Sequence, residues 1–101
     1  MPKKQHDPVN HPMHYTRGDV ECIDAIESAV EGLHGADAFL TGQVIKYEYR
    51  WRHKGDPREN LLKARWYLNR QIARVEREEE EEARARAQDE ESLHLHAPGE
   101  F

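Results

Sequence analysis

Residues 43–54 read QVIKYEYRWRHK, and the organisation of the chain is clearest from this stretch outward. If the stretch is helical, apolar side chains recur at spacings of three and four on one stripe, which consists of Leu40, Val44, Tyr47 and Trp51. The adjacent stripe is polar and mostly basic, and consists of Gln43, Lys46, Arg50 and His53. An apolar wall beside cations, with Tyr49 close by, suits an anionic planar ligand such as a nucleotide. The same pattern also fits a core helix whose basic side chains are merely solvated.

The composition predicts one small domain with a limited core. The chain has 101 residues, of which 35% are charged, and a mean hydropathy of -1.05. At this size little surface can be buried, so we expect a homo-oligomer, and part of the chain should be tail or exposed helix. The single cysteine, Cys22, excludes an internal disulfide and a zinc site built on several thiols. No apolar run approaches the ~20 residues of a membrane span, and the N-terminus lacks a signal segment, so we expect a soluble intracellular protein without a membrane partner.

The charge is unevenly distributed. Residues 41–75 hold nine Lys or Arg against three acids, a balance of +6, whereas residues 76–101 hold three Arg against ten acids, a balance of -7. The acidity therefore belongs to the C-terminal part. We expect an N-terminal arm over residues 1–8, a nucleotide-binding helical domain over 9–75 and an acidic tail over 76–101.

The N-terminal segment reads as a loop, because residues 1–18 contain three prolines and no helical periodicity. It is nevertheless rich in groups that bind ligands: Asn10, His11, His14 and Tyr15. Such a loop laid over a helical body could close a pocket, or it could be an ordinary arm that covers the core. The two histidines are three residues apart, but the proline between them argues against a metal site, and we predict none.

Two helices are predicted between residues 19 and 53. The first begins with Asp19 as its N-cap, because the carboxylate can accept the free amides of the first turn, and Gly32 and Gly35 end it. The second covers about residues 36–53, and Gly55 stops it.

The sequence Asp56-Pro57-Arg58-Glu59 predicts the start of a third helix, with Asp at the N-cap, Pro at the first helical position and Glu three residues after the cap. This helix repeats the design of the second, since its basic stripe with a tyrosine consists of Lys63, Tyr67, Arg70 and Arg74. From Glu76 onward good helix formers continue without a core stripe, which predicts a helical extension or disorder rather than a magnesium site in the glutamate run. The predicted fold class is therefore all-α: a small three-helix domain with an ordered N-terminal loop and a charged tail.

The motifs of common enzymes are absent. The sequence contains no GxxxxGK[ST] phosphate loop and no Gly-x-Ser-x-Gly or Cys–His nucleophile pattern, so we predict no catalytic residue and no cofactor. Mg²⁺ would be needed only by a kinase. Nucleic acid is not the expected partner, because the glutamate-rich tail would repel a phosphate backbone.

Three stretches together carry a family resemblance: VNHPMHYTRGDVECIDAIE, GQVIKYEYRWRHKG and ENLLKARWYLNR. They resemble a small phage-encoded family with the motifs NHPxHY, ECID, GNxIKYxxRxxxK and LxKAxWYL, whose members are labelled a domain of unknown function or a phage nucleotide kinase. The chain departs from the pattern at Gln43, where the family prefers Asn. The resemblance implies a nucleotide-related function in the cytoplasm of an infected host.

Three functions remain open. Some relatives are similar to nucleoside monophosphate kinases, while others suggest oligomeric proteins that sequester cyclic nucleotide signals of bacterial antiphage defence. Because a kinase must position two phosphates and Mg²⁺ and the sequence has no phosphate loop, we prefer sequestration without turnover. The third possibility is a helical adaptor that binds a host protein.

The candidate site combines three kinds of group. Lys46, Arg50 and Lys54 are expected to hold phosphate, the histidine loop is expected to stack on or hydrogen-bond the base, and two amides are expected to read base or ribose edges. The candidate ligand-binding residues are Asn10, His11, His14, Tyr15, Gln43, Lys46, Tyr49, Arg50, Lys54, Asn60 and Lys63.

Overall fold

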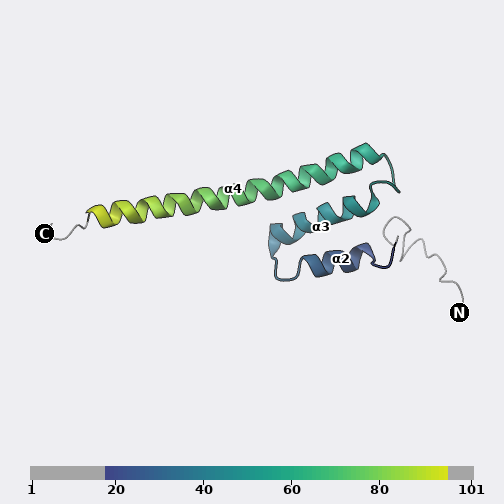
Figure 1. Ribbon diagram of the computed structural model, residues 1–101, viewed down its shortest axis with the longest axis horizontal. Coiled ribbons are helices and arrows are strands. Elements are labelled where there is room, and N and C mark those ends of the chain that lie inside the picture. Colours follow the sequence, from purple (N-terminus) through teal and green to yellow (C-terminus); the bar gives the residue numbers. More distant parts are fainter. Residues whose placement is uncertain (1–17, 96–101) are drawn as a thin grey trace, which may run out of the picture. The chain divides into compact units, whose positions relative to one another are not determined.

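The computed structural model describes residues 18–95, which form three helices and no strand (Figure 1). These are α2 (Cys22–Ala29), α3 (Gly35–Arg50) and α4 (Pro57–Leu95). The predicted all-α class is confirmed, and the C-terminal part of the chain is helical as far as Leu95. No helix within the described range combines the length and the apolar character that crossing a bilayer would require. The predicted N-terminal loop lies outside the described residues.

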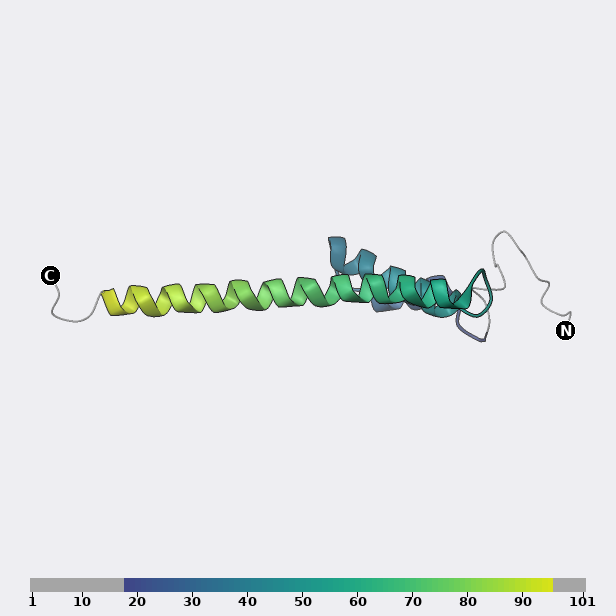
Figure 2. The same ribbon diagram turned by 90° about the horizontal axis from the view of Figure 1, so that it is seen from above.

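The chain divides into two compact units, Met1–Gln71 and Ile72–Phe101. The first unit contains α2, α3 and residues 57–71 of α4, and the second contains the remainder of α4. Figure 2 shows α4 as one uninterrupted helix. The candidate site is built entirely from the first unit.

The first helix begins later than the sequence indicated. Glu21, in an extended conformation with φ -72° and ψ 148°, occupies the N-cap of α2, and no side chain caps the helix. Gly18 adopts a φ of +83° and the chain bends through residues 18–20, so Asp19 lies two residues before the cap position. The prediction of Asp19 as the N-cap was therefore wrong.

The glycines after α2 act differently from the prediction. The helix ends at Ala29, and the next N–H, that of Val30, still donates to the carbonyl of Ile26. Gly32 then adopts a φ of +84°, which redirects the chain, whereas Gly35 is already the first residue of α3.

The second helix ends earlier than predicted, at Arg50 rather than near His53. The N–H groups of His53 and Lys54 both donate to the carbonyl of Arg50, at 2.9 and 3.1 Å, and Gly55 with φ +73° completes the reversal. His53 therefore belongs to the connection rather than to the basic stripe of the helix, and Lys54 lies in the same connection.

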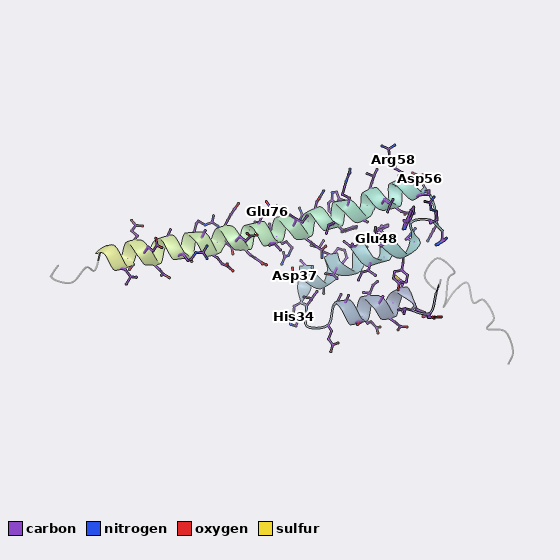
Figure 3. All side chains as sticks on the ribbon, viewed as in Figure 1. His34, Asp37, Glu48, Asp56, Arg58 and Glu76 are labelled. Carbon is purple, nitrogen blue, oxygen red and sulfur yellow. The ribbon has the colours of Figure 1, made fainter. Side chains whose placement is uncertain are left out.

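The start of α4 agrees with its sequence signature. Pro57 is the first helical residue, and the N–H of Glu59 donates to the carboxylate of Asp56 at 3.1 Å. Figure 3 labels Asp56 at this end of α4. The N–H of a first helical residue has no partner within the helix, so a proline there leaves no N–H unpaired. The aspartate accepts one of the remaining free amides, so neighbouring residues alone specify where this helix begins.

A glycine brings α2 and α3 together. A Cβ placed on Gly42, in the middle of α3, would lie 3.3 Å from Cγ2 of Ile26 on α2. Only a residue without a side chain allows this approach without displacing the isoleucine. The buried apolar residues of the described chain are Cys22 on α2, Leu40 on α3 and Ala64 on α4, one from each helix.

Polar contacts join α3 to the beginning of α4, which lies on the other side of α3 from α2 (Figure 1). The side-chain amide of Gln71 donates to Oγ1 of Thr41 at 3.1 Å, and that hydroxyl donates to the carbonyl of Asp37 at 2.8 Å. At the opposite end of this pair of helices, the amide nitrogen of buried Asn60 donates to the carbonyls of Trp51, at 3.3 Å, and Lys54. Asn60 thus ties α4 to the connection that precedes it.

We expect the close contact at Gly42 to limit substitution by size. Gly42→Leu should lower the free energy of unfolding by about 1–3 kcal/mol, because the new side chain must push α2 away. Gly42→Ala is the control and should change it by less than about 1 kcal/mol, because the gain in helix propensity offsets the tight contact. Urea denaturation of both variants measures the difference, and equal stability would contradict this account of the packing.

We expect Asn60→Ala to destabilise the fold by about 1–3 kcal/mol, because two carbonyls of the connection lose their donor while remaining near the core. Asn69→Ala, at an exposed position on the same helix, is the matched control and should be close to neutral. Thermal unfolding followed by circular dichroism tests the pair. Similar midpoints for the two variants would show that Asn60 does not hold the connection.

Candidate functional site

Four aromatic rings gather where α3 meets α4. The rings of Tyr47 and Tyr67 stack, with centroids 5.9 Å apart and planes inclined by 14°. The other two rings meet Tyr67 edge to face, Trp66 at 5.0 Å and Phe39 at 6.1 Å. Edge-to-face and offset-stacked pairs are the favoured arrangements of aromatic rings, so these four residues form a coherent aromatic cluster.

Three cations surround one ring of this cluster. Nζ of Lys46, Cζ of Arg50 and Nζ of Lys63 lie 5.2, 5.5 and 5.7 Å from the centroid of Tyr47. Two of these cations come from α3 and one from α4, so the packing of the two helices brings them together. Each contact is of the cation–π kind, worth about 0.5–1 kcal/mol at an exposed position.

The cluster borders an open depression of about 280 Å³, lined by Tyr47, Lys63, Trp66 and Tyr67. Its walls thus combine flat aromatic surface, two phenol groups and one ammonium group. Trp66 is 57% exposed, and Cζ of Arg70 lies 5.6 Å from its ring centroid. Ligand pockets usually measure about 300–1,000 Å³, so this depression could hold one planar ring and would leave the rest of a nucleotide outside.

The structure brings some of the predicted residues together. Lys46, Arg50 and Lys63 converge on Tyr47 as described, and Gln43, which precedes Tyr47 by four residues on α3, lies on the same side of that helix. Gln43, Lys46 and Arg50 are all half-buried.

Other predicted residues lie elsewhere. Tyr49 follows Tyr47 by two residues and therefore points about 200° around the helix from it. Lys54 is exposed in the connection after α3, and Asn60 is buried with its amide nitrogen bonded to backbone carbonyls. Within one chain, the structure therefore does not bring these three residues together with Lys46. The remaining candidates lie outside the described residues: Asn10, His11, His14 and Tyr15.

Three residues of the cluster were absent from the predicted site: Phe39, Trp66 and Tyr67. A signal for them exists in the sequence. Phe39 precedes Gln43 by four residues and Tyr67 follows Lys63 by four, so each lies next to a predicted binding residue on its own helix. What the sequence does not contain is the pairing of the two helices, which joins these local faces into one.

Lys46 also influences the single cysteine. Cys22 is buried on α2, and burial raises the pKa of its thiol, while the positive charge of Lys46 lowers that pKa in part. The amine of Lys46 therefore acts on α2 as well as on Tyr47. In the described part of the chain, no three His, Cys, Asp or Glu side chains are grouped so that they could hold a metal ion.

A second depression, of about 370 Å³, lies within the second unit and is lined by Arg74, Arg77, Glu78 and Glu81. These residues pair by spacing on one helix, Arg74 with Glu78 and Arg77 with Glu81, each four apart. Such pairs stabilise an exposed helix by about 0.2–0.5 kcal/mol each. These pairs explain why this part of α4 carries arginines beside glutamates, and no bound ligand is needed to explain the depression.

Removing the charge of Lys46 should raise the pKa of Cys22 further, because the thiolate then loses its nearby cation while the thiol stays buried. Ultraviolet absorbance of the thiolate across a pH titration measures this in Lys46→Ala. The absorbance of a Cys22→Ser protein is subtracted, because it contains the contribution of tyrosine ionisation without the thiolate. Arg58→Ala removes one positive charge elsewhere and is the control for the change in net charge. An unchanged or lowered pKa in Lys46→Ala would contradict the assigned position of the amine.

Comparison with known proteins identifies a family whose function is unknown. Residues 9–69 match the family described as "Protein of unknown function (DUF3310)". Because the match covers more than half of the chain, the chain belongs to this family. No curated protein and no solved structure matches the chain significantly.

Proposed function

We propose that this member of the DUF3310 family is a nucleotide-binding protein whose ligand docks on the aromatic cluster and its cations. The observation that carries the proposal is the convergence of Lys46, Arg50 and Lys63 within 5.7 Å of the Tyr47 ring, beside the depression that Trp66 and Tyr67 line. Flat rings next to several positive charges complement a molecule that is planar at one end and anionic at the other.

The two parts of a nucleotide would use different groups. A base gains about 1–3 kcal/mol by stacking on an aromatic side chain, and Phe39 and Trp66 offer the most exposed rings, at 56% and 57%. A phosphate would displace the cations from the Tyr47 ring and take charge-assisted hydrogen bonds in exchange, each worth about 1.5–3 kcal/mol. That exchange gives the site a preference for anionic over neutral planar molecules.

The depression is too small to enclose a whole nucleotide, so a second wall is part of the proposal. Asn10, His11, His14 and Tyr15 are the groups proposed to cover the exposed side of the ligand. They belong to the stretch that matches the family, and they lie outside the described residues.

The finer form of the proposal is sequestration: the protein holds a linear or cyclic nucleotide signal of bacterial antiphage defence in the host cytoplasm and returns it unchanged. It follows from the family resemblance together with the lack of a phosphate loop in the sequence. Phosphoryl transfer is the alternative outcome of the following test.

Thermal shift and isothermal titration with mono-, di- and cyclic nucleotides test binding. A ligand that binds only the folded state should raise the unfolding midpoint. Lys63→Ala should weaken binding about 10-fold or more, because losing one charge-assisted contact costs at least about 1.4 kcal/mol of binding free energy. Arg58→Ala, an exposed cation on the same helix, is the matched control and should leave affinity unchanged. Absence of binding by every nucleotide, or equal loss in both variants, would refute the site.

Recovery of the ligand separates binding from turnover. The protein is incubated with the tightest ligand, ATP and Mg²⁺, then heated, and the released small molecules are analysed. Intact ligand is expected from a sequestering protein. A phosphorylated product would replace that form of the proposal with a kinase.

A further inference from the structure

Among the described residues, more large apolar side chains are exposed than are buried. Only Cys22, Leu40 and Ala64 are buried apolar residues, and no large side chain in this part of the chain is fully buried. Several large apolar side chains are at the same time well exposed. Four of them recur along α4: Leu61, Leu68, Ile72 and Val75, with exposed fractions of 39%, 45%, 48% and 52%.

These four residues follow a heptad pattern, which we call the α4 stripe. Their separations of seven, four and three residues place them on one side of a helix, with Arg65 at the intervening position. The alkyl stem of an arginine can lie along an apolar stripe while its guanidinium reaches solvent, so Arg65 does not break the pattern.

The stripe is distinct from the side of α4 that packs on α3. The residues that make the inward contacts each precede a stripe position by one: Asn60 bonds to the connection, Ala64 is buried, Tyr67 stacks on Tyr47 and Gln71 bonds to Thr41. One residue is about 100° around a helix. The stripe therefore lies beside the inward side of α4 and is left without a cover among the described residues.

We propose that a second copy of this chain covers the α4 stripe by packing its own α4 there, antiparallel to the first. A single stripe of this kind is self-complementary, which is what an isologous dimer requires. With Leu68 at the centre, Leu61 of one copy lies opposite Val75 of the other. Four apolar positions from each copy then form a continuous seam.

Charge selects the antiparallel orientation. Residues 57–75 of α4 carry five Lys or Arg against one acid, whereas residues 76–95 carry three Arg against nine acids. Parallel helices would place the glutamate run of one copy beside that of the other. Antiparallel helices centred on Leu68 place Glu76, Glu78 and Glu79 beside the start of the partner helix, where Arg58 lies opposite Glu78. This arrangement keeps the two glutamate runs apart and gives an attractive contact at each end of the seam.

The composition of the stripe also limits its length. Positions 79 and 82, which would continue the heptad beyond Val75, are both glutamates. The seam ends there, and the rest of the acidic helix is free to interact through charge alone. The α4 stripe does not include Lys63, Trp66 or Tyr67, which line the proposed ligand site, so each proposal can be tested without the other.

Analytical ultracentrifugation of the full chain tests the interface. The wild type should sediment as a dimer and Leu68→Glu as a monomer. In the variant, each copy would have to bury one glutamate at the centre of the seam, away from water and beside the glutamate of its partner. Leu62→Glu is the matched control: this residue is similarly exposed, at 41%, but lies off the stripe, so the variant should remain dimeric. Circular dichroism verifies that all three proteins are equally helical. A monomeric wild type, or a dimeric Leu68→Glu variant, would overturn the proposal.

Disulfide trapping tests the orientation. In a Cys22→Ser background, Leu61→Cys and Val75→Cys proteins are mixed and oxidised, and the mixed disulfide should form faster than either homodimeric one, because only closely opposed cysteines can bridge. Faster Leu61→Cys self-crosslinking would indicate parallel helices and overturn the antiparallel arrangement.

Nucleotide titration of Leu68→Glu separates the two proposals, since its affinity should equal that of the wild type if the stripe is not part of the ligand site.

Discussion

The stacking of Tyr47 on Tyr67 is the contact on which the pairing of α3 with α4, and with it the candidate site, is centred. It joins α3 to α4 in the middle of their common length, between the Gln71–Thr41 hydrogen bond at one end and the Asn60 contacts at the other. With so few buried apolar residues, the two helices cannot rely on an aliphatic core for their alignment. Directional contacts, ring against ring and amide against carbonyl, set it instead.

The same rings make the site. Tyr47 packs one face of its ring against Tyr67. The rest of the ring remains accessible to the cationic groups of Lys46, Arg50 and Lys63, which lie within 5.7 Å of its centroid. Fold and proposed function therefore share residues, and substitution of either tyrosine would affect both. The cations are a cleaner probe, since their removal leaves the stack in place.

A small protein with a thin core has two ways to cover apolar surface. One is a ligand against the exposed rings of Phe39 and Trp66, and the other is a second copy against the α4 stripe. The two surfaces differ in character: the first is aromatic and basic, and the second is aliphatic. This difference in chemistry is the reason why we propose an anionic planar molecule for the first surface and an identical helix for the second.

Sequence alone determined the features that depend on neighbours along the chain. The helical class, the start of α4 at Pro57 with Asp56 as its cap, and the helical spacing of the cations on α3 are all set by local propensity, capping and periodicity. These are short-range effects, which operate before any helix meets another.

Tertiary structure decided what each side chain faces. In the structure, α3 ends at Arg50, and the side chain of Asn60 binds backbone carbonyls instead of facing a pocket. Gly42 contacts Ile26 on α2. The candidate site also includes Phe39, Trp66 and Tyr67. None of these follows from periodicity, because a helical repeat specifies which residues share a side of one helix but not which side of another helix they meet. That pairing arises only when α2, α3 and α4 pack together.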